Sequence, residues 1–539
     1  MKSKILLCLL CFFIHLTLFS CLTTNVETEI QTSTLDDSSI NRKYLYWGED
    51  WEEKNPEYSS RTEALDTIFN PDELGQMVLV LDRSEWNKQL EYCGINIDHE
   101  ECVVAKGFYF SKDDKEWFFK DIGFRIRGNT SRIRPQDEET GKYVQSHFSL
   151  DFEEWTDDDK KLANSMKGII LKRFKNDPTY VREVYGYNLF RENGVWISPR
   201  ASYTRLVIQI VDDLDLDNDG NTTEFETVDY GVYAMIEEIK KQFLKERTEE
   251  QNGGNLVSNK GNLWKCSWGA DFTVPRNQKG FGEESSEIIF DENGNIENID
   301  VKSYTYDYKG DNDFTEAKSQ LLGFMAELAL LPNCVDGRND KEDIEKIKRF
   351  YTERIDGDLL LQTYAVNVIL GMWDDYWVNK NNFYFYFDTD GKAYFIPYDY
   401  DNVLGINNCG VNSGIQNPML WGNLKDGERP LIQKMLQVPE YMELYREYLM
   451  KFSDENSFFD DDNSIAKIKQ WQAMIEPYIN SKDLQYNYNS KMSYFDTTPF
   501  FMDVPAYWSK PYVKYTLYTE GTNNFFTVRQ RFIKKALDK

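Results

Sequence analysis

Acidic and amide side chains are concentrated in residues 371–405, GMWDDYWVNKNNFYFYFDTDGKAYFIPYDYDNVLG. Asp374 and Asn379 are separated by four residues, and Asp399 follows a stretch that predicts a β-hairpin over an Asp-Gly turn. Carboxylate and amide oxygens are ligands for hard divalent cations. The stretch is therefore either a site that holds metal ions or an acidic, solvated rim of a sheet.

The spacing also suits phosphoryl transfer, which needs a carboxylate near the acceptor hydroxyl, oxygen ligands for Mg²⁺ and a lysine on the phosphates. In protein kinases a catalytic aspartate and a metal-binding asparagine have the D-x-x-x-x-N spacing of Asp374 and Asn379. A further metal-binding aspartate follows a hairpin there, as Asp399 does here. Because Asp and Asn are common in this chain, the spacing alone favours the solvated rim.

Other catalytic chemistries find few residues in this chain. There are 3 histidines, of which His15 lies in an N-terminal apolar run and His99 and His147 lie in no catalytic motif. The HExxH zinc motif is absent, and Cys266, Cys334 and Cys409 are scattered with no CxxC pairing. Cys93 and Cys102, which lie beyond the N-terminal apolar run and Cys21, are close enough in sequence to suggest a bridge in an oxidising compartment.

The composition excludes some partners. With 539 residues, 41% apolar residues and 15% aromatics, the chain can bury a substantial core in one to three domains. Its net charge of −29 argues against nonspecific binding to nucleic acid or anionic lipid, and suits divalent cations.

The N-terminus, MKSKILLCLLCFFIHLTLFSCLTT, has the layout of a secretory signal. We expect residues 1–20 to be a bacterial lipoprotein signal peptide, with Cys21 lipidated after cleavage. An ordinary signal peptide or an uncleaved anchor are the alternatives. Residues 21–62 would then be a flexible tether, and the protein would be secreted across the inner membrane and lipid-anchored at the cell surface or envelope.

Periodicity predicts a β-rich N-terminal half and a mainly helical C-terminal half that carries the hairpin, with no internal repeat. Residues 77–86 are expected as a strand followed by a short polar turn, and residues 107–128 as a hairpin over KDDK. Further strands are expected at 146–152, 168–174, 203–211 and 229–239, and helices at 178–194, 314–331, 341–355, 356–373, 430–453, 464–479 and 525–539.

The segment WDDYWVNKNNFYFYFDTDGKAYFIPYDYDNVLG closely resembles the CotH kinase family, in which W-D-x-Y-x-x-N-x-N-N-Y-Y-x-Y precedes a strand ending in P-W-D-x-D-x-x-x-G. Tyr398 stands where the family often has Trp, and Asp375 where Gly or Asn is frequent. Four more family motifs match in order, so that the resemblance spans about residues 76 to 405. They are FRIRGNTSR (124–132), LKRFKNDPTYVREVYGYNLFRENG (171–194), YGVYAMIEEI (230–239) and GNLWK (261–265).

The resemblance implies an α+β, atypical protein-kinase-like fold, with a β-rich N-terminal lobe and a mainly helical C-terminal lobe carrying a catalytic β-hairpin. The kinase-like domain would span residues 63–450, with lobes at about 76–305 and 310–450. Residues 451–539 would form a helical, aromatic-rich extension packed on that body.

The resemblance also implies an activity: transfer of the ATP γ-phosphate to Ser or Thr of surface or secreted proteins, with Mg²⁺ or Mn²⁺. The membrane would be a partner only through the lipid anchor, and nucleic acid would not be one. The alternative is an inactive surface lipoprotein that uses the fold as a protein- or carbohydrate-binding module. A carboxylate-based glycosidase would use the acids, but it leaves the asparagines unexplained.

Residue roles follow from the resemblance. Asp374 would orient the acceptor hydroxyl, and Asn379 would bind metal, with Asn381 or Asn382 as neighbouring possibilities. Asp399 would bridge Mg²⁺ to the phosphates, and Asp401 would share or replace it.

The resemblance makes Lys265 the best candidate for the phosphate-contacting lysine and Glu237 for its acidic partner. Arg127, with Gly128 and Asn129, would contact phosphates through its guanidinium and free backbone N–H groups, or Arg127 would be a structural arginine buried against the sheet. The chain departs from the family at VQSHFSLDF, where lysines are common.

A second metal candidate lies outside the acidic hairpin. Asp215, Asp217, Asp219, Gly220 and Glu226 fit the D-x-D-x-D-G-x5-E pattern of EF-hand calcium loops. The flanks predict strands instead of the two helices of an EF-hand. A loop stabilised by Ca²⁺ and an acidic, solvated β-turn without metal both remain open.

Overall fold

The computed structural model describes residues 53–129, 131–155, 166–175, 177–212, 225–248, 254–273, 280–333, 341–405, 413–423, 429–484 and 524–538. The described helices and strands make an α+β fold, as the sequence predicted. The expected signal peptide, Cys21 and most of the tether lie outside these residues. The last part of the expected tether is described, and there Lys54 exchanges backbone hydrogen bonds with Phe118 of 2.9 and 3.0 Å.

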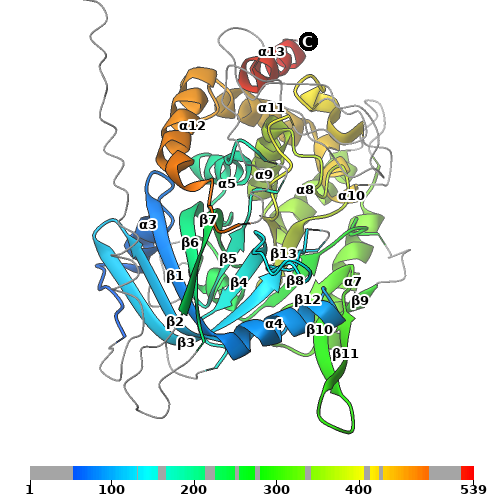
Figure 1. Ribbon diagram of the computed structural model, residues 1–539. Helices are drawn as coiled ribbons and strands as arrows, with labels where there is room; N and C mark the ends of the chain where they lie inside the picture. Colours follow the sequence, from blue (N-terminus) through cyan, green and yellow to red (C-terminus); the bar gives the residue numbers. More distant parts are fainter. Residues whose placement is uncertain are drawn as a thin grey trace, which may run out of the picture. The chain divides into compact units, whose positions relative to one another are not determined.

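Seven strands close into a barrel in the order β1-β2-β3-β4-β5-β7-β6 (Figure 1). Neighbouring strands are antiparallel except β1 and β6, whose parallel pairing closes the barrel. Its interior holds a core of apolar side chains from alternate strand positions. The strands are β1 (Leu74–Asp82), β2 (Val103–Lys112), β3 (Lys115–Arg127), β4 (His147–Asp151), β5 (Gly168–Lys172), β6 (Ala201–Val211) and β7 (Phe225–Glu237).

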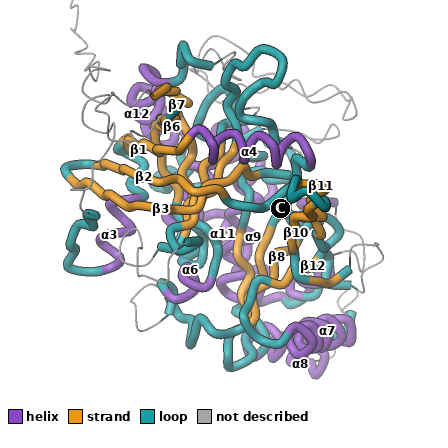
Figure 2. The backbone as a smooth tube through the Cα atoms, turned by 60° about the horizontal axis from the view of Figure 1, so that its bottom comes forward, coloured by secondary structure: helices purple, strands orange, loops and turns teal. Residues whose placement is uncertain are grey.

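One prediction about this half was wrong. The polar residues after β1 begin a helix, α4 (Arg83–Ile95), which lies against β1 and β2 (Figure 2). Trp86, Leu90 and Cys93 are buried at spacings of four and three residues, which is one face of a helix. Of the polar residues between them, which suggested a turn, Gln89 is also buried, whereas Asn87 and Glu91 are exposed. A shorter helix, α3 (Arg61–Ile68), precedes the barrel.

A second sheet has the order β14-β13-β8-β12-β9. The predicted hairpin is confirmed as β13 (Phe383–Phe387) and β14 (Ala393–Pro397). It pairs through β13 with β8 (Asn262–Cys266), and β12 (Tyr306–Tyr308) and β9 (Phe281–Gly282) complete the sheet. A separate ribbon, β10 (Ser285–Phe290) with β11 (Ile296–Lys302), is joined to the end of α4 by a 2.9 Å hydrogen bond from Asn96 to the Ile299 carbonyl.

Helices dominate the second half, as predicted. Nearly every residue of α9 (Gly357–Leu370) is buried, so this helix runs through the core. The remaining α-helices of the described chain are α5 (Arg182–Glu192) and α6 (Lys241–Lys245) in the first half. In the second half they are α7 (Phe314–Leu330), α8 (Lys341–Glu353), α9, α10 (Pro430–Gln433), α11 (Pro439–Phe452), α12 (Asp461–Ile475) and α13 (Phe525–Leu537). Short 3-10 helices are η2 (Pro418–Asn423), η3 (Met435–Gln437) and η4 (Glu476–Tyr478). Within the described part of the chain, no helix is both long and apolar enough to cross a membrane.

The last helices are joined to the rest of the fold through α5. The ring of Tyr185 on α5 contacts Phe458, Trp471 on α12 and Phe526 on α13. Cys93 and Cys102 are both free thiols, so the bridge that their spacing suggested is not formed.

Candidate functional site

The connection from β5 to α5 is built around the buried carboxylate of Asp177. It accepts hydrogen bonds from the backbone N–H groups of Val181 and Arg182, at 3.1 and 3.0 Å. Backbone N–H groups at the start of a helix have no acceptor within the helix, so the Asp177 carboxylate acts as a cap for α5, whose N-cap residue Val181 makes no side-chain cap hydrogen bond. The guanidinium of Arg182 pairs with Asp177 and donates to the carbonyl of Val403, 3.0 Å away. One buried ion pair thus fixes both the start of α5 and the segment after β14.

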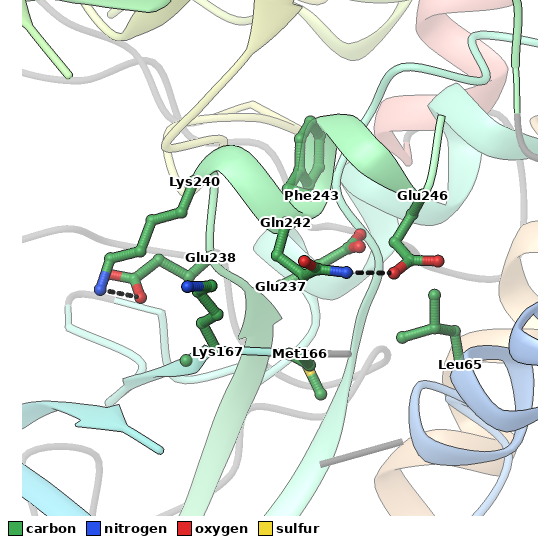
Figure 3. A pocket seen from close by; sticks show the side chains of 10 residues that line it. Leu65, Met166, Lys167, Glu237, Glu238, Lys240, Gln242, Phe243 and Glu246 are labelled. Atoms are coloured by element: carbon green, nitrogen blue, oxygen red, sulfur yellow. Dashed lines mark hydrogen bonds and ion pairs between the residues drawn. The ribbon is translucent and has the colours of Figure 1, made fainter. Parts of the chain in front are cut away.

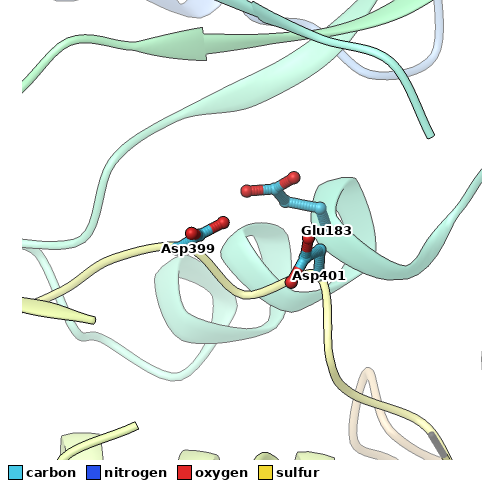
Figure 4. A group of neighbouring side chains, drawn as sticks. All are labelled: Glu183, Asp399 and Asp401. Atoms are coloured by element: carbon cyan, nitrogen blue, oxygen red, sulfur yellow. The ribbon is translucent and has the colours of Figure 1, made fainter. Parts of the chain in front are cut away.

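Lys172, the last residue of β5, lies among three carboxylates. Its Nζ is 2.7 Å from Glu183 and 3.6 Å from Asp401, and it contacts Oδ1 of Asp399 directly. Glu183 comes from the first turn of α5, and both aspartates come from the segment after β14 (Figure 4). Oxygens of the three carboxylates lie within 4.8 Å of one another.

Three carboxylates surround the Lys172 ammonium, and Lys175 is a further cation within electrostatic range of Asp399 and Asp401. Burial raises the pKa of Glu183 and of Asp401, and Lys172 lowers both without cancelling the increase. Burial lowers the pKa of Lys172, but Asp399, Asp401 and Glu183 outweigh it and hold the ammonium protonated. The cluster therefore favours an additional cation.

The segment that carries Asp399 is held in an unusual conformation. Asp399 has a φ of 62°, in the left-handed region that non-glycine residues rarely adopt. Its backbone N–H donates to the hydroxyl of Tyr187 at 2.9 Å. The preceding residue, Tyr398, accepts a 2.6 Å hydrogen bond from Arg127 of β3. Contacts from α5 and from the barrel thus hold Asp399 in this conformation. Residues held in rarely adopted backbone conformations are concentrated at functional sites.

Asp374 lies in the loop between α9 and β13, surrounded by amides. Its Oδ1 accepts hydrogen bonds from the side chains of Asn379 at 2.5 Å and Asn381 at 3.2 Å. Its backbone carbonyl accepts one from Asn382 at 2.9 Å. Gly371, with a φ of 69°, ends α9 and starts this loop; a Cβ there would lie 2.8 Å from the Cβ of Ser413.

Burial raises the pKa of Asp374, the amides of Asn379 and Asn381 lower it, and the charge of Asp399 raises it. The charge of Asp374 in turn raises the pKa of Asp401. Asp374 thus lies within electrostatic range of the cluster around Lys172. The structure brings together Asp374, Asn379, Asp399 and Asp401, all four of which the sequence singled out.

The expected pair of Lys265 and Glu237 is not formed, and this prediction was wrong. Glu237 is buried against Arg247 and Arg200, at 2.7 and 3.7 Å. Burial raises the pKa of Glu237, but these two arginines outweigh that effect and lower it to about 2. Lys265, on β8, lies 3.5 Å from Glu284 instead. The two belong to different sheets, which the sequence motifs did not reveal.

The surroundings of Glu237 also offer no room for a nucleotide. Glu237 lines a cavity of about 10 Å³, the space of one water molecule, together with Glu238, Lys240, Gln242 and Phe243 (Figure 3).

Arg127 has two protein partners. Besides Tyr398, its guanidinium contacts Glu238 at 3.4 Å, and the side chain is only 14% exposed. These contacts favour the structural alternative for Arg127. Asn129 is exposed, and its carbonyl accepts the backbone N–H of Arg132 at 3.1 Å. Gly128 has a φ of 121°, a backbone conformation that favours glycine.

The sequence reasoning missed Lys172 and Glu183, although both lie inside the matched segment 171–194. A signal was present: Lys172 ends the apolar run GIIL, and Glu183 lies in the first turn of the helix that follows. A strand lysine and a helix glutamate in direct succession are the elements that pair in protein kinases.

The calcium-loop residues Asp215, Asp217 and Asp219 lie outside the described residues. Glu226 is described, on β7. Its carboxylate contacts Arg83 at 2.9 Å and accepts the hydroxyl of Tyr143 at 2.5 Å, while Asp212 pairs with the same arginine at 2.7 Å.

Comparison with known proteins gives one family match. A family model described as CotH kinase protein matches residues 124–501, well over half of the chain. The match begins inside β3. It includes the β5–α5 connection, the loop with Asp374, the hairpin, and the segment with Asp399 after β14. No curated protein matches the chain.

Proposed function

Because the chain belongs to the CotH kinase family, we propose that it transfers the γ-phosphoryl group of ATP to Ser or Thr hydroxyls of surface or secreted proteins, with Mg²⁺ or Mn²⁺. The barrel would be the N-terminal lobe of an atypical kinase fold, and the helical half with its hairpin would be the C-terminal lobe. The observation that carries the proposal is the convergence of Lys172, Glu183, Asp399 and Asp401, with Asp374 within electrostatic range.

The residues present fit a divalent metal and a nucleotide phosphate. The donors of the cluster are carboxylate oxygens, which Mg²⁺ prefers, and the cluster carries an excess of negative charge. Asp399 and Asp401 would hold the metal, with Asn379 as a further ligand. A metal held by these residues would supply positive charge that neutralises the phosphates.

Lys172 replaces Lys265 in this proposal as the lysine that contacts the phosphates. Glu183 positions the Lys172 ammonium, since the two are 2.7 Å apart at adjoining ends of β5 and α5. Such an ion pair holds a flexible lysine in one place and keeps it charged.

Asp374 would accept the proton of the acceptor hydroxyl. Asn379 and Asn381 fix its carboxylate through their amides, and burial with the nearby Asp399 raises its pKa. A carboxylate with a raised pKa is a better proton acceptor than one in water.

The test separates binding from chemistry. In the wild type, ATP with Mg²⁺ should raise the melting temperature, and the purified chain should become labelled by γ-labelled ATP. Asp399→Asn and Lys172→Met should lose the nucleotide-dependent shift, whereas Lys265→Met, a matched lysine outside the site, should keep it. Asp374→Asn should keep the shift and lose the labelling.

The absence of any metal-dependent nucleotide shift in the wild type would contradict the proposal. A shift without labelling, either of the chain itself or of added envelope proteins, would favour the alternative of an inactive binding module. We also propose that the chain is exported and anchored by a lipid on Cys21, in line with the layout of its N-terminus.

A further inference from the structure

Lys172 is buried more deeply than two of the carboxylates that it contacts. Its side chain is 14% exposed, whereas those of Asp399 and Asp401 are 34% and 33% exposed. Glu183, at 4%, closes the inner side. The ammonium therefore reaches the carboxylates from inside the protein, while a cation from solvent would reach Asp399 and Asp401 from outside.

We propose that Lys172 is an internal cation that occupies the acidic site in the absence of ligands, so that a divalent metal must compete with it for the carboxylates of Asp399 and Asp401. A nucleotide would relieve this competition, because its phosphates offer the ammonium of Lys172 another anionic partner. The nucleotide part of this inference rests on the proposed function, and the metal part does not.

The competition follows from charge and position. Lys172 contacts Oδ1 of Asp399 directly, and that carboxylate is also a proposed metal ligand. A metal on the same carboxylate would stand within several ångströms of the ammonium, where like charges repel strongly in a poorly solvated site. Without Lys172, three carboxylates would face one another without the ammonium that contacts all of them. Removing the ammonium should therefore strengthen metal binding and weaken the metal-free fold.

The effect is reciprocal by linkage. If a nucleotide raises the affinity for metal by drawing Lys172 away, metal must raise the affinity for the nucleotide by the same factor. In Lys172→Met this mutual increase should be smaller, because only the direct attraction between metal and phosphates remains.

The first test uses Mn²⁺ alone, with binding measured by calorimetry and by the shift in melting temperature. Lys172→Met should bind Mn²⁺ about tenfold more tightly than the wild type, or better, and should melt at a lower temperature without metal. Lys172→Arg keeps the positive charge and should bind Mn²⁺ as weakly as the wild type. Lys265→Met removes a lysine that lies beside Glu284, outside the site, and should change nothing.

Equal or weaker Mn²⁺ binding by Lys172→Met would overturn the inference. If that variant does not fold without metal, the same comparison is made in a Glu183→Gln background, which removes one negative charge. Lys172→Met/Glu183→Gln should then bind Mn²⁺ about tenfold more tightly than Glu183→Gln alone.

The second test adds a non-hydrolysable ATP analogue. The analogue should raise the Mn²⁺ affinity of the wild type by a larger factor than that of Lys172→Met. If Lys172→Met binds Mn²⁺ more tightly but no nucleotide binds the wild type, the proposed function fails and the internal cation stands. If the analogue raises Mn²⁺ affinity equally in both proteins, Lys172 is not the coupling residue and the inference fails while the proposed function stands.

Discussion

Arg127 connects the barrel to the segment that carries Asp399. Its guanidinium donates to Tyr398 and pairs with Glu238, and both contacts are shielded from solvent. The family often has Trp at the position of Tyr398, and an indole has no oxygen to accept this hydrogen bond. The hydrogen bond from Arg127 to the segment that carries Asp399 therefore depends on this chain's tyrosine.

Replacing Arg127 tests whether it is structural. Arg127→Met should lower the free energy of unfolding in the absence of ligands by about 3 kcal/mol, because it leaves a buried Glu238 without one of its partners. Urea denaturation of the metal-free protein measures this loss. Unchanged stability together with weaker nucleotide binding would instead assign Arg127 to the phosphates.

His99 makes the stability of the protein depend on pH. It is fully buried, its Nε2 lies 2.6 Å from Gln89 Nε2, and burial lowers its pKa to about 4. The unfolded chain takes up the proton near pH 6.5 and the folded chain does not, so stability is complete above that pH and falls as the pH is lowered towards 4. The shift corresponds to about 3 kcal/mol at pH 4.

The measurement is the urea midpoint between pH 7 and pH 4.5. His99→Gln, which keeps polar atoms but does not titrate, should show a smaller fall than the wild type. The difference between the two proteins isolates the histidine from the carboxylates, which titrate in both. Parallel curves would contradict the prediction.

Among the elements, the β5–α5 connection does the most to position the site. Five ordered motifs were visible in the sequence, yet their spacing along the chain could not show which strands share a sheet. Lys265 and Glu237 looked like partners because both lie in matched motifs, and the sheets separate them. Helix α4 was not predicted from the sequence for a local reason. Its buried face includes the polar residue Gln89, and the polar residues on its outer faces resemble those of a turn.

Asp177 should matter more than an ordinary helix cap. Asp177→Ala should cost about 3 kcal/mol or more, because it removes the cap of α5 and leaves the buried Arg182 without its carboxylate. Asp313→Ala is a matched control: Asp313 caps α7 through the backbone N–H of Glu316 at an exposed position, so its loss should cost about 1 kcal/mol. Equal losses in thermal or urea unfolding would contradict the role of the buried pair.

The loop before β7 has its own test. If residues 215–226 bind Ca²⁺, calcium should raise the melting temperature of the wild type, and Glu226→Gln should reduce that increase. Asp212→Asn is the control, because Asp212 shares Arg83 with Glu226 but lies outside the calcium motif. If calcium does not change the melting temperature of the wild type, or changes it equally in Glu226→Gln, the calcium hypothesis is wrong and the acidic turn binds no metal.

For the whole molecule, the sequence predicted the α+β class, most elements and the loops of Asp374 and Asp399. Those features depend on local periodicity and on motifs. The position of Lys172 among carboxylates from two distant segments depends on tertiary packing, which one sequence does not display. The resemblance identified the matched segment 171–194, and only the structure selected Lys172 and Glu183 within it.

Localisation is also a property of the whole chain. If Cys21 carries a lipid, the protein produced in a bacterial host should sediment with membranes, and Cys21→Ser should release it to the soluble fraction or stop its maturation. Recovery of both proteins in the same fraction would contradict a lipid anchor at this residue.

The ion pair of Lys172 with Glu183 joins residues that are near in sequence, whereas Asp399 and Asp401 arrive more than 200 residues later. A chain exported from its N-terminus would first form a neutral pair, and would then add two negative charges without a positive one. The last step in building the site is thus the one that raises its electrostatic energy. A divalent cation in the compartment where the protein folds should speed that step, so that metal would act as a folding partner before any substrate is bound.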